Sequence, residues 1–374
     1  MNFDFSDDQK LLKEQVKKML ADKCGLDRVR KVLDGDEPFA KDVWDGLVEM
    51  GLTGTAIPEQ YGEVGLGALE LCVIAEELGR SAAPVPFSTS VYLATEALVS
   101  AGSEAQKQSW LPKLAAGEVI GTFAMSEGPG AAGPRTIETS FKGGKLNGTK
   151  VPVPDGDFAD FALVLANTSG KGDKALSLVL VDLTGAGVAR EAVKTIDPTR
   201  SHATITFTDA PAELLGAEGD GWATTATVFD SAAILMAFEQ IGGAEAAMWM
   251  ARDYALERYA FGRLIGSYQA IKHKIADMYV KLELARSNCY FGAMMLNDGG
   301  AELPEAAAAA RISATEAYRY AAQENIQVHG GIGYTWEADT QFYFRRSKLL
   351  ALALGSALEW KDKLVTRLET RNAA

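Results

Sequence analysis

Cysteine and histidine are scarce in this sequence, which limits the chemistry that it can carry. Its 374 residues include three cysteines and three histidines. The cysteines form no Cys-x-x-Cys pair, and no two histidines stand four residues apart, as two metal ligands on one helix face do. A disulfide-stapled scaffold and a bound zinc ion are therefore both disfavoured, and no resident metal is expected.

A basic excess and long apolar runs are also missing. Lys and Arg total 37 against 50 Asp and Glu, so the formal net charge is −13 at pH 7. This balance disfavours nucleic acid as a partner, because such binding needs a basic face. No apolar run reaches the roughly 18 residues of a membrane helix, and the N-terminus lacks the pattern of a signal peptide. The sequence predicts a soluble cytoplasmic protein with no membrane partner.

Apolar residues are plentiful, at 47% of the chain, and their spacing divides it into three parts. In residues 1–117 they recur at steps of three and four, with Ser6 as a predicted N-cap, which indicates helices. Residues 118–220 contain short apolar runs and, in His202–Thr208, a strict alternation, which indicates strands. Helical spacing returns in residues 221–374. We therefore predict a mostly α protein with a middle β domain, divided at these boundaries.

Two long helices are expected in the last part. The first carries an apolar stripe that steps by four and three residues, as a helix in a bundle does. The members of the stripe are Ile271, Ile275, Met278, Leu282, Ala285 and Cys289. The second, Glu302–Val328, is rich in alanine, with Pro304 near its start and Gly330-Gly331 after its end.

One glycine motif resembles a nucleotide-binding fingerprint without its context. Gly128-Pro-Gly-Ala-Ala-Gly133 matches Gly-x-Gly-x-x-Gly. In dinucleotide-binding proteins a helix follows these glycines and its N-terminus holds the pyrophosphate. Here Pro134 follows, and then a segment that leads to Gly143-Gly144 without helical spacing. We interpret the motif as a glycine-rich turn.

Two further motifs each allow a structural and a functional interpretation. Arg258–His273 lies at a break between two helical patterns, where arginines serve either as solvated residues of a turn or as ligands of phosphate. Gln327–Glu337 contains three glycines at a helix end. Such glycines form either an ordinary C-cap or a backbone platform for a flat or phosphorylated ligand. Taken singly, neither motif distinguishes the structural interpretation from the functional one.

The combination of motifs is more specific. Phe123-Ala-Met-Ser-Glu127, Arg258-x-x-Phe-Gly with Gln269 behind it, and Gln327-x-x-Gly-Gly-x-Gly resemble, in this order and spacing, the acyl-CoA dehydrogenase family. The resemblance covers nearly the whole chain. It implies an FAD-binding protein with an N-terminal helical domain, a β-barrel or sandwich-like middle domain and a C-terminal four-helix bundle. Members of the family are usually tetramers.

The resemblance also implies which residues contact FAD. The residues along the flavin ring would be Phe123, Met125 and Ser126, with Ser126 hydrogen-bonded to the pyrimidine side. The residues that hold the pyrophosphate and adenine half across a subunit interface would be Arg258, Phe261 and Gln269. The opposing cradle would consist of Gln327, Gly330 and Gly331. This chemistry suits FAD, which offers two phosphates to an arginine and an apolar ring system to a strand.

The implied reaction needs a base that this chain lacks at the usual places. In the family, a carboxylate removes the proton next to a thioester carbonyl, the β hydrogen leaves as hydride to the flavin, and an electron-transfer flavoprotein takes the electrons. The carboxylate needs an apolar site that raises its pKa. Many members carry it before a Gly-Thr or Gly-Ser, where this chain has Leu354. A second branch carries it near the start of the first bundle helix, where this chain has Ala232.

Glu239 is the remaining candidate base. It lies seven residues after Ala232, about two turns along the same helix face. Its surroundings in the sequence resemble branches associated with branched, cyclic or steroid side-chain thioesters. The structural alternative is a glutamate at an interface or distant from the substrate. Glu127 and Glu337 are weaker candidates.

The implied flavin contacts also depart from the family pattern. Pro152 and Pro154 replace an aromatic residue and a threonine that many members place against the ring, and proline donates no backbone hydrogen bond. The serine and aspartate that commonly close the middle-domain loop are replaced within Gly130–Pro134. These changes weaken the expectation of standard catalysis.

Three functions follow, in this order of preference. The first is an FAD-dependent acyl-CoA dehydrogenase for a bulky or unusual acyl thioester, with an electron-transfer flavoprotein as electron acceptor, in a homotetramer or a heterotetramer. The second is a degenerate partner subunit in a heteromeric tetramer whose other chain carries the base. The third is a flavin-dependent oxidase or monooxygenase of the same fold, which needs oxygen access and no thioester base.

Overall fold

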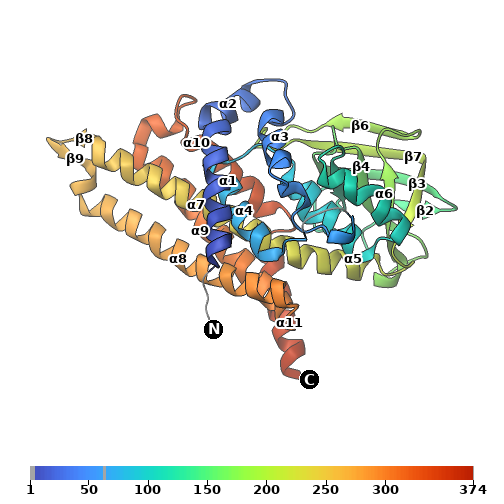
Figure 1. The fold of residues 1–374 in the computed structure, drawn as a ribbon. Helices are drawn as coiled ribbons and strands as arrows, with labels where there is room; N and C mark the ends of the chain where they lie inside the picture. Colours follow the sequence, from blue (N-terminus) through green and yellow to red (C-terminus); the bar gives the residue numbers. More distant parts are fainter. Residues whose placement is uncertain (1–4, 62–64, 374) are drawn as a thin grey trace. The chain divides into compact units, whose positions relative to one another are not determined.

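The computed structural model describes residues 5–61 and 65–373, which form two compact units. The first unit contains the described residues up to Lys31, together with Ala68–Ala83 and those from Ala233 onward. The second contains the described residues of 32–67 and 84–232. Figure 1 shows the fold as a ribbon, with labels on the α-helices and on many of the strands.

The first unit is helical. Its long helices are α7 (Gly221–Glu257), whose first residues belong to the second unit, α8 (Gln269–Asp298) and α9 (Leu303–His329). Its other elements are α1 (Asp7–Lys23), α2 (Leu26–Asp34), whose last residues belong to the second unit, α4 (Ala68–Arg80), β8 (Tyr259–Ala260), β9 (Arg263–Leu264), η5 (Ile265–Ser267), η6 (Gly330–Tyr334), α10 (Thr340–Leu352) and α11 (Ala357–Ala373).

Local sequence signals account for two of these helices. The Ser6 hydroxyl accepts the Gln9 N–H at 3.2 Å, and the Gln9 side chain accepts the Ser6 N–H at 2.9 Å. This reciprocal capping box starts α1, as the sequence predicts. In α8 the last four members of the apolar stripe are buried, and the helix packs along α9. Ile271 and Ile275, at the start of the stripe, stay partly exposed.

Two glycines allow α4 and α7 to meet backbone to backbone. A Cβ on Gly79 of α4 would lie 1.8 Å from the carbonyl oxygen of Glu239 on α7. A Cβ on Gly242 of α7 would lie 1.9 Å from the carbonyl oxygen of Glu76 on α4. No side chain can occupy either space, so glycine is required on both helices. The contact carries the charged side chains of Glu76 and Glu239 into the interior of the unit.

A partly buried ionic network compensates one of these charges. The fully buried Glu76 carboxylate accepts from Lys13 of α1 at 2.5 Å and from Arg286 of α8 at 2.6 Å. Arg80 of α4 and Arg286 both reach the Glu245 carboxylate of α7, at 2.7 and 3.1 Å. The network therefore joins four helices that are distant in the sequence.

The second unit contains all the long strands. They are β1 (Gly121–Ala124), β2 (Ser140–Lys142), β3 (Lys145–Pro154), β4 (Phe161–Asn167), β5 (Leu176–Asp182), β6 (Val188–Ala192) and β7 (His202–Leu215). Its helical elements are α3 (Lys41–Glu49), η1 (Leu52–Gly54), η2 (Glu59–Tyr61), η3 (Ser88–Thr95), α5 (Glu96–Ala101), α6 (Glu104–Ala115) and η4 (Asp173–Ala175).

Five of these strands close into a small barrel. The order is β4-β2-β3-β7-β5, and β5 pairs again with β4. β1 joins β4 in parallel, and β6 joins β7 antiparallel. On β7, Ala203, Ile205 and Phe207 are buried, as the alternation in the sequence predicts. β2 and β3 are joined through Gly143 and Gly144, both in the left-handed region, which a two-residue hairpin turn requires.

One predicted helix differs from the structure. The spacing in Val91–Val99 predicts a single α-helix, but the chain forms the π-helix η3 and then α5. The Thr95 hydroxyl donates to the Ser90 carbonyl, five residues earlier, at 2.8 Å, which suits the wider π turn. η3 packs closely on β1, since a Cβ on Gly121 would lie 2.6 Å from the Ala94 Cβ.

The fold-class prediction is confirmed: the chain is mostly helical, with a barrel-like β region in the middle and a helical C-terminal part. No helix forms between β1 and β2, so Gly128–Gly133 is the glycine-rich turn that was expected. The boundaries after residues 117 and 220 stay predictions.

Cys24, Cys72 and Cys289 are buried free thiols. Within the described ranges, no helix has the length and apolar character to cross a bilayer, and no cluster of acidic, histidine or cysteine side chains could hold a metal.

The ionic network leads to a stability prediction. Glu76→Gln leaves the partly exposed Lys13 and Arg286 with one carboxylate fewer, and removing the buried partner of an ion pair costs about 3 kcal/mol. We expect the free energy of unfolding, measured by urea denaturation at pH 7, to fall by about that amount. The matched control is Lys41→Ala, which removes an exposed pair with Asp45 and should change the free energy by about 0.5 kcal/mol or less.

The same variant should change the response to acid. Burial raises the pKa of Glu76, but the charges of Lys13 and Arg286 outweigh burial and hold it below 4.5. The stability that this carboxylate contributes is therefore present above pH 4.5 and is lost as the pH falls through its lowered folded value. Glu76→Gln should show a smaller loss of stability in this window, and an unchanged acid dependence would contradict the assignment.

Candidate functional site

The implied flavin-ring residues lie at the end of β1 in the second unit. Phe123 is buried on β1 and makes an edge contact with Phe229, with ring centroids 5.4 Å apart. After β1 ends, the carbonyl oxygen of Ser126 accepts the Val151 N–H at 2.9 Å, and Glu127 forms an isolated parallel bridge with Val151. The structure therefore brings Met125–Glu127 beside the strand that carries Pro152 and Pro154.

An ion pair between a buried lysine and a partly exposed glutamate fixes this segment. The Lys150 ammonium on β3 donates to Glu127 Oε1 at 2.7 Å and to the Met125 carbonyl oxygen at 3.0 Å. The Glu127 carboxylate also accepts the N–H groups of Glu138 and Thr139, at 2.7 and 3.0 Å. Burial raises the pKa of Glu127, but Lys150 and these hydrogen bonds outweigh burial and lower it. An ionised carboxylate held in this way suits a structural role better than that of a base.

The two prolines lie where the sequence suggests a changed flavin contact. The Pro154 carbonyl oxygen accepts the Thr122 hydroxyl at 2.5 Å. Neither Pro152 nor Pro154 has an N–H to offer, and the Val151 N–H is engaged by Ser126. This part of β3 therefore presents fewer donors than a regular strand does.

The implied pyrophosphate and adenine residues lie in the first unit, on and beside the hairpin β8–β9. Arg258 precedes the hairpin, and its carbonyl oxygen accepts the Ile265 N–H at 2.8 Å. Phe261 stands at the turn with φ of 53° and is 97% exposed. Gln269 is exposed at the first turn of α8. Within the described ranges, the Arg258 guanidinium forms no ion pair, so it is available for an anion.

The residues of the implied opposing cradle lie close to this hairpin. Gln327 is exposed near the end of α9, and Gly330 and Gly331 open η6. The rings of Tyr254 and His329 stack with centroids 4.1 Å apart, which joins the end of α7 to the end of α9. A Cβ on either glycine would meet no atom within 4 Å, so the backbone is open to close approach. The two groups of residues therefore gather at one end of the helical unit.

Glu239, the candidate base, is fully buried on α7 in the first unit. Its Oε1 lies 3.6 Å from the Arg346 guanidinium of α10, which is buried as well. Arg346 also donates to the carbonyl oxygens of Ala82 and Ala83, both at 3.2 Å. These contacts are typical of a buried ion pair that ties helices together, which is the structural alternative for Glu239. Its assignment as base stays a prediction.

A second buried arginine connects the neighbourhood of Glu239 to the loop where many members carry the base. Arg311 of α9 donates to Gln240 Oε1 at 2.5 Å, to the Leu350 carbonyl and to the Ala353 carbonyl at 2.6 Å. Burial lowers the pKa of Arg311 to about 9, and the charge of Glu239 opposes this shift. Arg311 thereby satisfies carbonyl groups at the end of α10.

The loop after α10 has a defined shape although it lacks the glutamate. Leu354 adopts φ of 62° and Gly355 φ of 104°. Ser356 and Glu359 form a reciprocal cap for α11, with Ser356 N–H to Glu359 Oε2 at 2.6 Å and Glu359 N–H to Ser356 Oγ at 3.3 Å. The loop that contains Leu354 is therefore held at both ends.

One further carboxyl has the character that a base requires. Burial raises the pKa of Glu96 on α5, and its hydrogen bond with Ser231 of α7 only partly offsets this. Within the described part of the chain, Glu96 has no cationic partner, unlike Glu127 and Glu239. Ser231 directly precedes Ala232, the position of the base in the second branch. Glu337, the last candidate, is exposed after η6.

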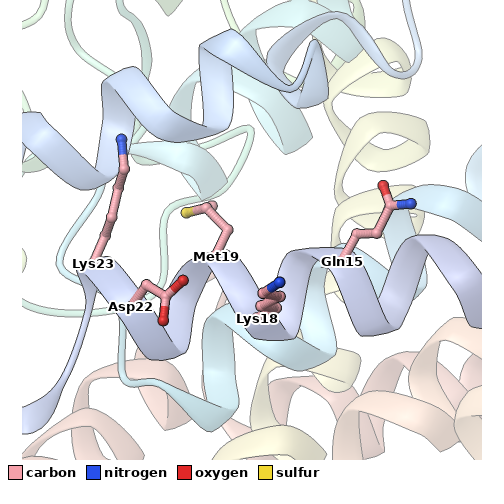
Figure 2. Close-up of a pocket in the computed structure, with 5 residues that line it drawn as sticks. All are labelled: Gln15, Lys18, Met19, Asp22 and Lys23. Carbon is pink, nitrogen blue, oxygen red and sulfur yellow. The ribbon is translucent and has the colours of Figure 1, made fainter.

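A depression of about 280 Å³ on α1 is lined by Gln15, Lys18, Met19, Asp22 and Lys23. Figure 2 shows these five side chains. All five side chains come from one helix, and four of them are exposed. None of the residues implied in FAD binding or catalysis borders it. This depression is therefore not the candidate site.

Two residues that matter for the site were missed in the sequence. Lys150 lies on a strand where a charged residue suggests a solvent-facing position, yet it is fully buried. Arg311 could have been noticed, because it is the single charged residue in Ala306–Ala314. A lone arginine in such an apolar run indicates a buried, hydrogen-bonded guanidinium.

The closed β unit is flanked in sequence by helices. The motif residues lie at the end of a strand, at a hairpin and at the end of a helix. These features define an acyl-CoA dehydrogenase-type fold. Comparison with known proteins is consistent with this class. The family model for the acyl-CoA dehydrogenase N-terminal domain matches residues 6–118. The model for the C-terminal domain of the same family matches residues 219–357.

Individual relatives are similar over nearly the whole chain. The identity to acyl-CoA dehydrogenase IpdE2 of Mycobacterium tuberculosis is 32% over 367 residues, which is 97% of either chain. A chain in the ChsE4–ChsE5 complex from Mycobacterium tuberculosis has a TM-score of 0.89 and 27% identity, with 99% of both chains covered. A chain of a Tcur3481–Tcur3483 steroid ACAD variant has a TM-score of 0.89 and 28% identity, with 98% of this chain and 99% of that chain covered. The protein belongs to the acyl-CoA dehydrogenase family of oxidoreductases.

Proposed function

We propose that this protein binds FAD and catalyses the α,β-dehydrogenation of an acyl-CoA thioester. The observation that carries the proposal is the gathering of Arg258, Phe261, Gln327 and Gly330-Gly331 at one end of the helical unit, joined by the stack of Tyr254 on His329. A guanidinium with no ion pair among the described residues, and an open glycine backbone at the same end of the unit, suit a diphosphate with a flat base attached.

The residues present fit FAD at both of its ends. Arg258, Phe261 and Gln269 would hold the pyrophosphate and adenine half across a subunit interface, and Gln327 would belong to the opposing cradle. At the flavin end, the Ser126 hydroxyl has no hydrogen-bond partner within the described ranges and is available to the pyrimidine ring. Phe123 and Met125 supply apolar surface beside it. Pro152 and Pro154 remove donors from the neighbouring strand, so more of the polar contact would rest on Ser126.

When bound, FAD accepts a hydride from the β carbon of the substrate. The chain must then supply a carboxylate that takes the α proton and donors that polarise the thioester carbonyl. Glu239 is the proposed base. We propose an electron-transfer flavoprotein as the electron acceptor and a branched, cyclic or steroid side-chain acyl group as the substrate. The similarity to the Tcur3481–Tcur3483 steroid ACAD supports this substrate class.

A second function is favoured by the contacts of Glu239. This carboxylate lies against Arg346 in the interior, and the two usual base positions hold Leu354 and Ala232. A chain that binds FAD without a base of its own would serve as one subunit of a heteromeric tetramer. The solved ChsE4–ChsE5 complex, which contains a chain similar to this one along its whole length, supports such an assembly.

The deciding experiment is an anaerobic titration of the purified protein with straight-chain, branched and cyclic acyl-CoA thioesters, followed by the flavin absorbance. Bleaching by one class supports a dehydrogenase that is active alone and defines its substrate class. A yellow protein that no thioester bleaches supports the partner-subunit function. Rapid reoxidation of the reduced flavin by air would instead support an oxidase or monooxygenase.

Arg258→Ala should weaken the binding of FAD. Loss of a charge-assisted hydrogen bond to phosphate removes about 1.5–3 kcal/mol, which corresponds to at least a tenfold higher dissociation constant. Fluorescence titration of the apoprotein with FAD measures this constant. The matched control is Arg252→Ala, which removes an exposed arginine that stacks on Trp249 of the same helix and should leave it unchanged. Equal affinity in both variants would contradict the assignment of Arg258.

Glu239→Gln tests whether Glu239 is the base in a protein whose flavin a thioester reduces. If Glu239 is the base, the variant retains FAD but loses flavin reduction by the substrate by a factor of about 100 or more, because an amide cannot take the proton. If Glu239 is only the counter-charge of Arg346, reduction survives and the urea midpoint falls. Glu96→Gln is the matched comparison, since Glu96 has a raised pKa without a cationic partner. Stopped-flow absorbance at the flavin band gives the rates.

A further inference from the structure

Lys150 is a fully buried lysine in the middle of the barrel strand β3. Its strand neighbour on β7 is Ile205, and the charged group that faces it is the Glu127 carboxylate. A buried ammonium is costly unless its protons find acceptors. An apolar residue at this position would fill the same space without that cost. We therefore ask which groups the Lys150 ammonium binds.

The Lys150 ammonium binds two acceptors in one short segment of the chain. The ammonium donates to Glu127 Oε1 at 2.7 Å and to the Met125 carbonyl oxygen at 3.0 Å. Both acceptors belong to Met125–Glu127, the segment that begins where β1 ends. Apart from Lys150, β3 holds this segment through the hydrogen bond from the Val151 N–H to the Ser126 carbonyl.

Glu127 extends the same connection to a third segment. Its two carboxylate oxygens accept the backbone N–H groups of Glu138 and Thr139, just before β2. A single charged pair therefore ties the end of β1 to β3 and to the start of β2. The prolines at 152 and 154 give β3 no N–H with which to replace this connection.

We propose that Lys150 is a positioning residue for FAD: by binding the Met125 carbonyl and the Glu127 carboxylate, it holds Met125 and Ser126 in the conformation that receives the flavin ring. This inference rests on the proposed function. It assigns to Lys150 no contact with the cofactor and no proton transfer.

If Lys150 positions the segment through its charge, the affinity for FAD should depend on the protonation of Lys150. A residue that only fills space would give no such pH dependence. Burial lowers the pKa of Lys150 to about 8, although the Glu127 carboxylate opposes the shift. Above this pH the amine is neutral and the ion pair is lost, whereas Glu127 stays ionised. The affinity for FAD should therefore fall as the pH rises from 7 to 9.

The test is Lys150→Met in the full-length protein, with fluorescence titration of the apoprotein by FAD between pH 6.5 and 9. We expect at least a tenfold higher dissociation constant at pH 7 and the loss of the pH dependence. The matched control is Lys145→Met, at the exposed end of the same strand, which should bind FAD like the wild type at every pH. Near-ultraviolet circular dichroism of the apoproteins checks that the fold is retained.

If Lys150→Met does not fold, the same FAD titration is made with Glu127→Gln. This variant keeps the lysine and its bond to Met125 but removes the charge that stabilises the ammonium. The fall in FAD affinity should then move to a pH below 8. A folded Lys150→Met protein with wild-type affinity and pH profile overturns the inference, as does a pH profile that Glu127→Gln leaves unchanged.

These outcomes are distinct from failure of the proposed function. A wild-type protein that binds no FAD would contradict the proposed function itself. Normal FAD binding in the wild type together with normal binding in Lys150→Met rejects only the positioning role.

Discussion

The backbone contact between α4 and α7 is the constraint on which most of the helical unit depends. Gly79 and Gly242 each lie against a carbonyl oxygen of the opposite helix, and those carbonyls belong to Glu239 and Glu76. Two helices this close leave no space for side chains at the crossing, so the glutamates beside it are enclosed by the surrounding helices. Their charges must then be balanced from within, because buried carboxylates without partners would destabilise the fold. Arginine and lysine side chains from other helices meet this need.

Two buried arginines hold the surroundings of Glu239 and the end of α10. Glu239 supplies negative charge to Arg346, and Arg346 in turn satisfies carbonyl groups at Ala82 and Ala83. Arg311 holds the end of α10, so the loop around Leu354 keeps its shape without an acidic side chain. Interior hydrogen bonds therefore hold the end of α10 independently of the side chain at position 354.

Features with a local signature could be predicted from the sequence, and features that depend on distant partners could not. Apolar spacing predicted the strands of the barrel and the stripe of α8, and Ser6 predicted the start of α1. The motifs around Arg258 and Gln327 could be identified, but only the stack of Tyr254 on His329 shows that they gather in one place. The ion pair of Glu239 with Arg346 joins residues more than 100 positions apart, and no local sequence pattern near either residue predicts it. The π-helix was missed because α and π turns share similar apolar spacing over one or two turns.

The exposed aromatic residues of the helical unit have a practical consequence. Tyr259 and Phe261 on the hairpin, and Tyr334 and Trp336 beyond α9, present large apolar surfaces to water. Such surfaces favour self-association, whereas a net charge of −13 opposes it through repulsion between molecules. Salt weakens this repulsion and leaves the apolar attraction intact. Raising the ionic strength should therefore favour association of the chain through these surfaces.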